Sequence, residues 1–167
     1  MSLSMYAASV PVFIKTLNNM KGWLVKAQAH AETKKFDVNN IVGMRLAPDM
    51  LPFAAQIMIA CDGAKNGSSR LAGVEAPKFE DNEKTIAELV ARVEKTIGYL
   101  ETLSAAQFEG SEDKDIAHPS RSGDKHFKGQ PYLLTHVMPN FFFHSTMTYA
   151  ILRHAGVEVG KADFLGL

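Results

Sequence analysis

Four runs of apolar residues, spaced by steps of three and four, constrain this chain of 167 residues more than any other feature. Such steps keep side chains on one face of an α-helix, so each run predicts a helix with one apolar face. The runs lie at residues 6–27, 50–64, 86–100 and 134–152. Apolar faces of this length bury well only against one another, which predicts an all-α fold, a four-helix bundle.

Capping and helix-breaking residues predict where these helices end. Asp49 is the predicted N-cap of the second helix, and Gly67 with the serines that follow it is the predicted stop. Asp81 or Asn82 is the predicted N-cap of the third helix. Pro139 lies inside the fourth apolar run and predicts a kink there.

The linkers between the four helices are uneven in length. The first predicts a short extra helix around Val38–Met44, capped by Asp37. The longest linker spans residues 104–130. In it Ile116 and Phe127 flank the turn-rich stretch HPSRSGDK, a pattern that predicts a small β-hairpin. A linker of this length in a compact domain often carries function.

The composition indicates one globular domain, residues 1–167. Apolar residues make up 46% and charged residues 22%, as is usual for globular chains. Lys plus Arg and Asp plus Glu both number 18, so we expect no nucleic-acid partner, because such proteins carry a basic excess. A net charge of zero favours association, which supports a homodimer.

The chain shows no targeting or membrane signal. Its first residues, MSLSMYAASVPVF, lack a basic segment followed by an apolar one, so we predict no signal peptide. No run approaches the roughly 18 apolar residues of a membrane-spanning helix. We therefore expect a cytoplasmic protein with no membrane partner.

Asn140 and His144 form a polar pair within the apolar face of the fourth helix. Their spacing of four places both on one helical face. They could form a ligand pocket inside the bundle, where helical bundles hold metals and cofactors. Periodicity alone favours a different interpretation, a core histidine bonded to Asn140 or to backbone. Gln56 borders the apolar face of the second helix, and Asp62 lies at its boundary.

Two further side chains, on or before the second helix, are weak candidates for a catalytic or binding role. Cys61 is the single cysteine, which excludes an intramolecular disulfide. It has no neighbouring cation in sequence, so we predict a buried thiol and no nucleophilic role. Arg45 could bind an anion before the second helix, but pairing with Asp49 is the favoured prediction.

The remaining histidines give weaker patterns. His118 and His126 lie on either side of the predicted hairpin turn, where a surface metal contact is conceivable. His136 precedes His144 by eight residues, a rotation of about 80° that leaves them sharing only a broad face. Single exposed histidines are common and need no role.

The fourth helix also carries a resemblance to a known family. The stretch PNFFFHSTMTYAILRHAGVEVGKADFLG, with RLAPDM before the second helix, resembles a bacterial branch, of unknown function, of the DinB-like superfamily. Its members are four-helix bundles regarded as metalloenzymes, and many are dimers. Their metal is usually bound by three histidines, one on the second helix and two in an H-x-x-x-H on the fourth.

The resemblance places His144 at the second histidine of that pair, Asn140 at the first, and Gln56 near the helix-two ligand. Two of the three positions are thus amides, and a neutral amide is a poor zinc ligand. We expect Gln56, Asn140 and His144 to form an internal pocket that binds a small molecule with little or no metal. No cofactor is predicted apart from a divalent metal ion that His144 could hold.

Two further hypotheses stay open on the sequence. One is a metal-dependent enzyme of the thiol-dependent transferase or hydrolase type that uses His144. The second is a structural dimerisation module. The sequence identifies no catalytic residue.

Overall fold

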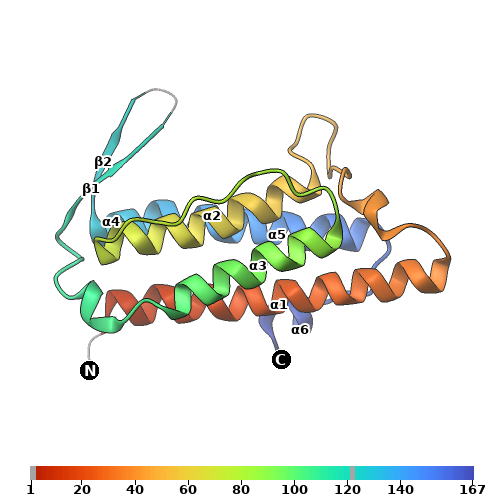
Figure 1. Cartoon of the computed structure of the whole chain (residues 1–167), viewed down its shortest axis with the longest axis horizontal. Coiled ribbons are helices and arrows are strands. Elements are labelled where there is room, and N and C mark those ends of the chain that lie inside the picture. The colour runs from red at the N-terminus through yellow and green to blue at the C-terminus, as the bar shows by residue number, and fades with distance from the viewer. Residues whose placement is uncertain (1–2, 121–122) are drawn as a thin grey trace.

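The computed structural model describes residues 3–120 and 123–167, and long helices dominate it (Figure 1). The helices are α1 (Met5–Lys34), α2 (Phe53–Ala72), α3 (Ile86–Glu101), α4 (Gly129–Tyr132), the π-helical turn η3 (Leu133–Val137), α5 (Met138–His154) and α6 (Lys161–Leu165). α4, η3 and α5 follow one another without a break and together form the fourth helical segment. The predicted all-α four-helix bundle is confirmed.

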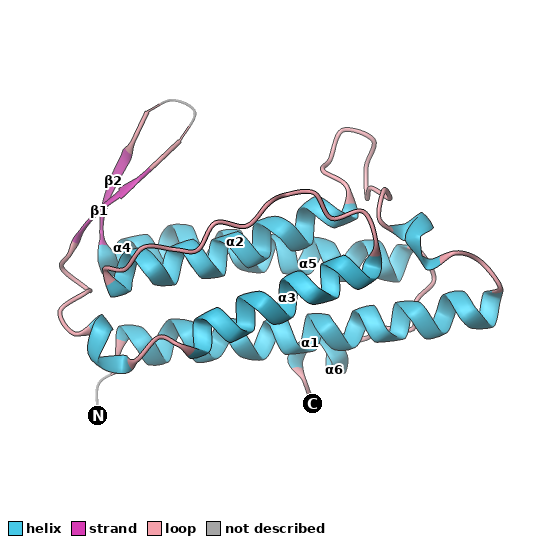
Figure 2. Ribbon diagram, in the orientation of Figure 1, coloured by secondary structure: helices cyan, strands magenta, loops and turns pink. Residues whose placement is uncertain are grey.

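The four segments do not simply alternate in direction. The connection between α2 and α3, residues 73–85, runs back along the length of the bundle as a long loop (Figure 2). α2 and α3 therefore point the same way, whereas α1 and α5 point the opposite way (Figure 1). This arrangement leaves α2 packed against both α3 and α5.

The predicted apolar faces make up most of the core. Phe13 of α1 contacts Phe141 of α5 edge to face, with ring centroids 4.8 Å apart. Ile57 of α2 and Val93 of α3 are fully buried. Leu134 is the exception, since it is half exposed.

The predicted ends of α2 are wrong. The helix begins at Phe53, so Asp49 lies outside it, and it continues past Gly67 to end at Ala72, with Gly73 as its C-cap. Gly73 takes a φ of 73°, the left-handed conformation that closes many helices. Gly67 lies inside the helix, where its missing side chain lets α2 approach Val137 of η3 closely. A Cβ at this position would lie 2.5 Å from Cγ1 of Val137.

The predicted N-cap of α3 is also wrong. Thr85 caps the helix, with its hydroxyl accepting from the backbone N–H of Glu88 and the Glu88 carboxylate accepting from that of Thr85. Asp81 is instead drawn to the buried guanidinium of Arg92, with Asp81 Oδ1 and Arg92 Nη2 2.8 Å apart. At Asp81, the ion pair with a distant residue outweighs the local tendency to cap the helix. Asn82, the second predicted cap, instead donates to the carboxylate of Glu80.

A wide helical turn precedes Pro139. The backbone N–H of Met138 donates to the carbonyl of Leu133, five residues earlier, instead of four. Pro139 has no N–H to continue the regular pattern, and π-helical turns of this kind accommodate such gaps. The irregularity predicted at this proline therefore takes the form of the turn η3.

The smaller elements agree with the sequence. The short helix η1 (Val38–Ile41) is capped by Asp37, and another single turn, η2 (Ala105–Phe108), follows α3. The predicted hairpin is formed by β1 (Asp115–His118) and β2 (Lys125–Lys128), with Ile116 opposite Phe127. Residues 121 and 122 of its predicted turn lie outside the described residues. The hairpin projects beside the start of α4 (Figure 1).

Across residues 3–120 and 123–167, none of the helices combines the length and the apolar character needed to cross a membrane.

Candidate functional site

Gln56 and His144 form a buried hydrogen bond between α2 and α5. His144 Nδ1 lies 2.7 Å from Gln56 Oε1, and both side chains are buried. Gln56 Nε2 donates to the carbonyl of Leu51 at 3.0 Å, which orients the amide so that Oε1 accepts. His144 must therefore carry its proton on Nδ1. Burial lowers the pKa of His144 below its ordinary 6.5, which keeps the imidazole neutral at neutral pH.

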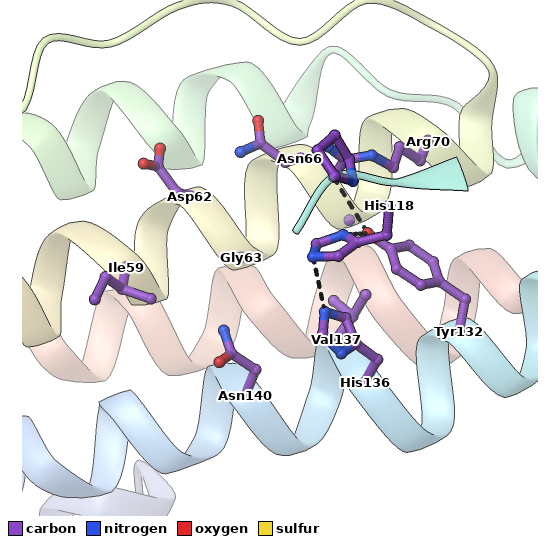
Figure 3. A pocket seen from close by; sticks show the side chains of 12 residues that line it. Ile59, Asp62, Gly63, Asn66, Arg70, His118, Tyr132, His136, Val137 and Asn140 are labelled. Atoms are coloured by element: carbon purple, nitrogen blue, oxygen red, sulfur yellow. Dashed lines mark hydrogen bonds between the residues drawn. The ribbon is translucent and has the colours of Figure 1, made fainter. Parts of the chain in front are cut away.

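Asn140 lies one turn away and faces a different space. It lines a cavity of about 410 Å³ between α2, the end of β1 and the fourth helical segment (Figure 3). Gln56 and His144 do not line this cavity. The three residues predicted to share one pocket are thus divided between two places, because Asn140 faces Gly63 of α2 while His144 is bonded to Gln56.

Four side chains from separate elements form a hydrogen-bonded row along the cavity wall (Figure 3). Arg70 Nη1 of α2 donates to Tyr132 Oη of α4 at 3.2 Å. Tyr132 Oη lies 3.3 Å from His118 Nδ1 at the end of β1. His118 Nε2 lies 3.2 Å from His136 Nε2 of η3. Together they join the hairpin to α2 and to the fourth helical segment.

The electrostatic environment keeps both imidazoles of this row neutral. Burial lowers the pKa of His118, and repulsion from His136 when that ring is protonated, from Arg70 and from Lys125 lowers it further. Burial, with Lys125 and Arg70, also lowers the pKa of His136. Two neutral imidazoles can share one proton donor and one acceptor, as their Nε2 contact requires. Burial raises the pKa of Tyr132, so the phenol stays protonated.

Asp62 reaches the edge of the same cavity, but its charge is already engaged. Its Oδ1 lies 3.0 Å from Arg92 Nη2 and 3.1 Å from Lys65 Nζ. Burial raises the pKa of the neighbouring Cys61 to about 12, so that thiol stays protonated. This agrees with the predicted buried role of Cys61 and gives it no nucleophilic character.

Arg45 and His118 have other partners than the sequence suggested. Arg45 donates to the backbone carbonyl of Met50, and among the described ion pairs it has none with Asp49. In the hairpin, His126 is exposed and opposite Ala117, whereas His118 turns into the cavity. His118 contacts His136 and not His126, the partner that the sequence made conceivable.

Sequence reasoning missed Arg70 and Tyr132 and undervalued His136. One local signal was present, since His136 and Asn140 are four residues apart and line one cavity. No sequence pattern connects His118 to His136, because the contact depends on how the hairpin docks.

The three positions that the resemblance assigns to a metal do not fit one. Two of them are amides, the oxygen of Gln56 is bonded to His144, and Asn140 lines a different space, so one imidazole is the single strong donor. Throughout the described part of the chain, no three or more His, Cys, Asp or Glu side chains are grouped so as to hold a metal ion. No reaction step through a metal at Gln56, Asn140 and His144 follows from this geometry.

Comparison with known proteins identifies the family. Residues 5–165 match the model of a family described as a domain of unknown function, DUF1993. A crystal structure of a DinB family member protein from Shewanella denitrificans, at 1.83 Å resolution, is 42% identical, with a TM-score of 0.92. That similarity covers 98% of this chain and 92% of the Shewanella chain. No curated protein matches.

The helical bundle with its hairpin and the near-complete match in sequence and structure lead to one conclusion: this chain belongs to the DUF1993 family, within the DinB-like superfamily.

Proposed function

We propose that this protein binds a small organic anion, such as a carboxylate, in the cavity between α2, the hairpin and the fourth helical segment. The observation that carries the proposal is the row of Arg70, Tyr132, His118 and His136 along one wall of that cavity. These groups present hydrogen-bond donors and a guanidinium to a partly enclosed space.

Charge favours an anion over a cation. Arg70 donates one N–H to an uncharged phenol, so its charge is not offset there. Asp62 is a cavity-lining carboxylate, and Arg92 and Lys65 offset its charge. A carboxylate can accept a forked pair of hydrogen bonds from Arg70 of α2, while the amide of Asn140 can donate from the fourth helical segment.

Thermal unfolding of the full chain in the presence of acetate, malonate and succinate tests the proposal. We expect at least one acid to raise the Tm, since a ligand at 100 times its Kd stabilises by about 2.7 kcal/mol. The uncharged amides of the same acids should leave the Tm unchanged. Arg70→Gln should abolish the shift, whereas Arg153→Gln, exposed at the end of α5, should preserve it. An equal shift in wild type and Arg70→Gln would contradict the proposal.

A metal-dependent reaction at His144 gains less support than anion binding. His144 is the single imidazole among the three positions, since Gln56 and Asn140 are amides and Asn140 lines a different space. Association into a homodimer and a cytoplasmic location stay predictions from the sequence.

A further inference from the structure

We propose that His118 and His136 bind a divalent transition-metal ion such as Zn²⁺ through their Nε2 atoms. The inference goes beyond anion binding, because the ion would bind in the absence of an organic ligand. The site also differs from the three-histidine set that the family resemblance implies. His118 belongs to the hairpin, and His136 lies eight residues before His144.

The distance between the two nitrogens suits a shared ion. Nε2 of His118 and Nε2 of His136 are 3.2 Å apart. Two nitrogens at the usual zinc distance, in a tetrahedral arrangement, are separated by about 3.3–3.4 Å. The rings have to turn from pointing at each other to pointing at the ion, and the proton on Nε2 of His136 has to move to Nδ1 of that ring so that both Nε2 lone pairs are free. Both side chains are half-buried, and His136 packs against Tyr132 and Phe127, with ring centroids 5.7 and 5.5 Å away, so the turn has to be small.

Tyr132 prepares His118 for ligation. The phenol oxygen accepts from Arg70 and lies 3.3 Å from His118 Nδ1, where it can accept a second hydrogen bond. A proton on Nδ1 leaves the lone pair of Nε2 free toward His136. Metal-binding histidines are commonly held by such a partner on the second ring nitrogen, which fixes the tautomer and the ring orientation.

The site would leave coordination positions open toward the cavity. Within the described residues no acidic or thiol side chain completes it. Asn140 lines the same cavity one helical turn from His136, and its amide or water could fill a further position. Imidazole ligands with open positions suit zinc, copper and nickel. Affinity should be lower than that of a closed structural zinc site with four protein ligands.

Calorimetric titration with zinc chloride tests the site in the tag-free full chain, stripped with EDTA and dialysed, without carboxylate present. We expect one ion per chain. Tyr132→Phe should weaken binding by about 10-fold or more, as loss of an outer partner usually does. His118→Asn and His136→Asn should weaken it further. His126→Asn, on the exposed side of the same hairpin, should leave zinc binding unchanged.

Absence of saturable zinc binding, or equal affinity in wild type and both ligand variants, would overturn the proposal. Imidazole nitrogen resonances of the wild type provide a test that needs no variant. Zinc should shift the Nε2 signals of two histidines, His118 and His136. Shifts seen only in other histidines would contradict the assignment. Carboxylate binding measured on the stripped and dialysed protein, free of both metal and EDTA, remains a separate result, so either idea can fail alone.

Discussion

Gln56 illustrates how one side chain sets the chemical state of another. Its amide nitrogen is held by the carbonyl of Leu51, so its oxygen is the group that faces His144. The histidine is thereby fixed as the Nδ1–H tautomer in a buried place. The sequence placed both residues near the core but left the partner of His144 open, because hydrogen-bond pairing between helices depends on their relative register.

The neutral state of His144 predicts a pH dependence of stability. Burial holds the pKa of His144 in the folded chain below 6.5, its ordinary value in the unfolded chain. At a pH between the folded and the unfolded pKa, the unfolded chain binds a proton at this residue that the folded chain does not. The free energy of unfolding should therefore fall as the pH drops below about 6.5, with a slope from this residue of up to about 1.4 kcal/mol per pH unit. Urea unfolding from pH 7.5 to 5.0 measures it.

His144→Gln should reduce this slope relative to the wild type, because the titrating group is gone. His154→Gln is the control, since His154 is exposed at the end of α5. An unchanged slope in His144→Gln would contradict the buried neutral histidine.

At the scale of elements, the contact between α2 and the fourth helical segment depends on a glycine that the sequence presented as a helix stop. Gly67 lies within α2, and a Cβ at this position would meet both methyl groups of Val137. The close approach of the two backbones also forms part of the cavity wall. A glycine inside a helix costs roughly 1 kcal/mol of helix propensity, and packing offsets that cost here.

Gly67→Ala should therefore destabilise the protein by about 1–3 kcal/mol, because overpacking outweighs the better helix propensity of alanine. Gly98→Ala provides the matched comparison, since Gly98 is exposed in α3 and a Cβ there meets nothing within 4 Å. That variant should gain up to about 1 kcal/mol. Thermal and urea unfolding distinguish the two, and a stabilised Gly67→Ala would refute the packing role.

At the scale of the whole molecule, the C-terminal segment closes over the bundle. Trp23 of α1 donates through Nε1 to the carbonyl of Asp163 at 3.0 Å and stacks on Phe164, with ring centroids 5.4 Å apart. Lys26 pairs with the Asp163 carboxylate at 2.6 Å. The short helix α6 lies beside α1 (Figure 1), and its contacts help to bury the indole of Trp23.

Trp23 is the single tryptophan, so its fluorescence reports this docking directly. Phe164→Ala should shift the emission to longer wavelength, because water reaches the indole, and should lower the free energy of unfolding by about 1–3 kcal/mol. Leu165→Ala on the exposed side of α6 is the control. A wild-type spectrum in Phe164→Ala would show that α6 does not shield Trp23.

The sequence by itself determined the helices, their buried faces and the small hairpin. Helical periodicity and turn residues are local signals, and a residue such as Phe13 needs only neighbours at steps of three and four to mark an apolar face. Asp37 capped η1 as predicted for the same reason, since its partner Asn39 is two residues away. The family resemblance rested on an equally local stretch of α5.

Only the tertiary structure decided the composition of the candidate site. His118 and His136 are 18 residues apart and meet because the hairpin folds against η3. Arg70 and Tyr132 join them from α2 and α4, 62 residues apart. Asn140 and His144 share a helical face but meet different residues of α2. Asn140 faces Gly63 and lines the cavity, whereas His144 is bonded to Gln56. Local spacing sets which face a side chain occupies, whereas the packing of distant elements sets what it meets.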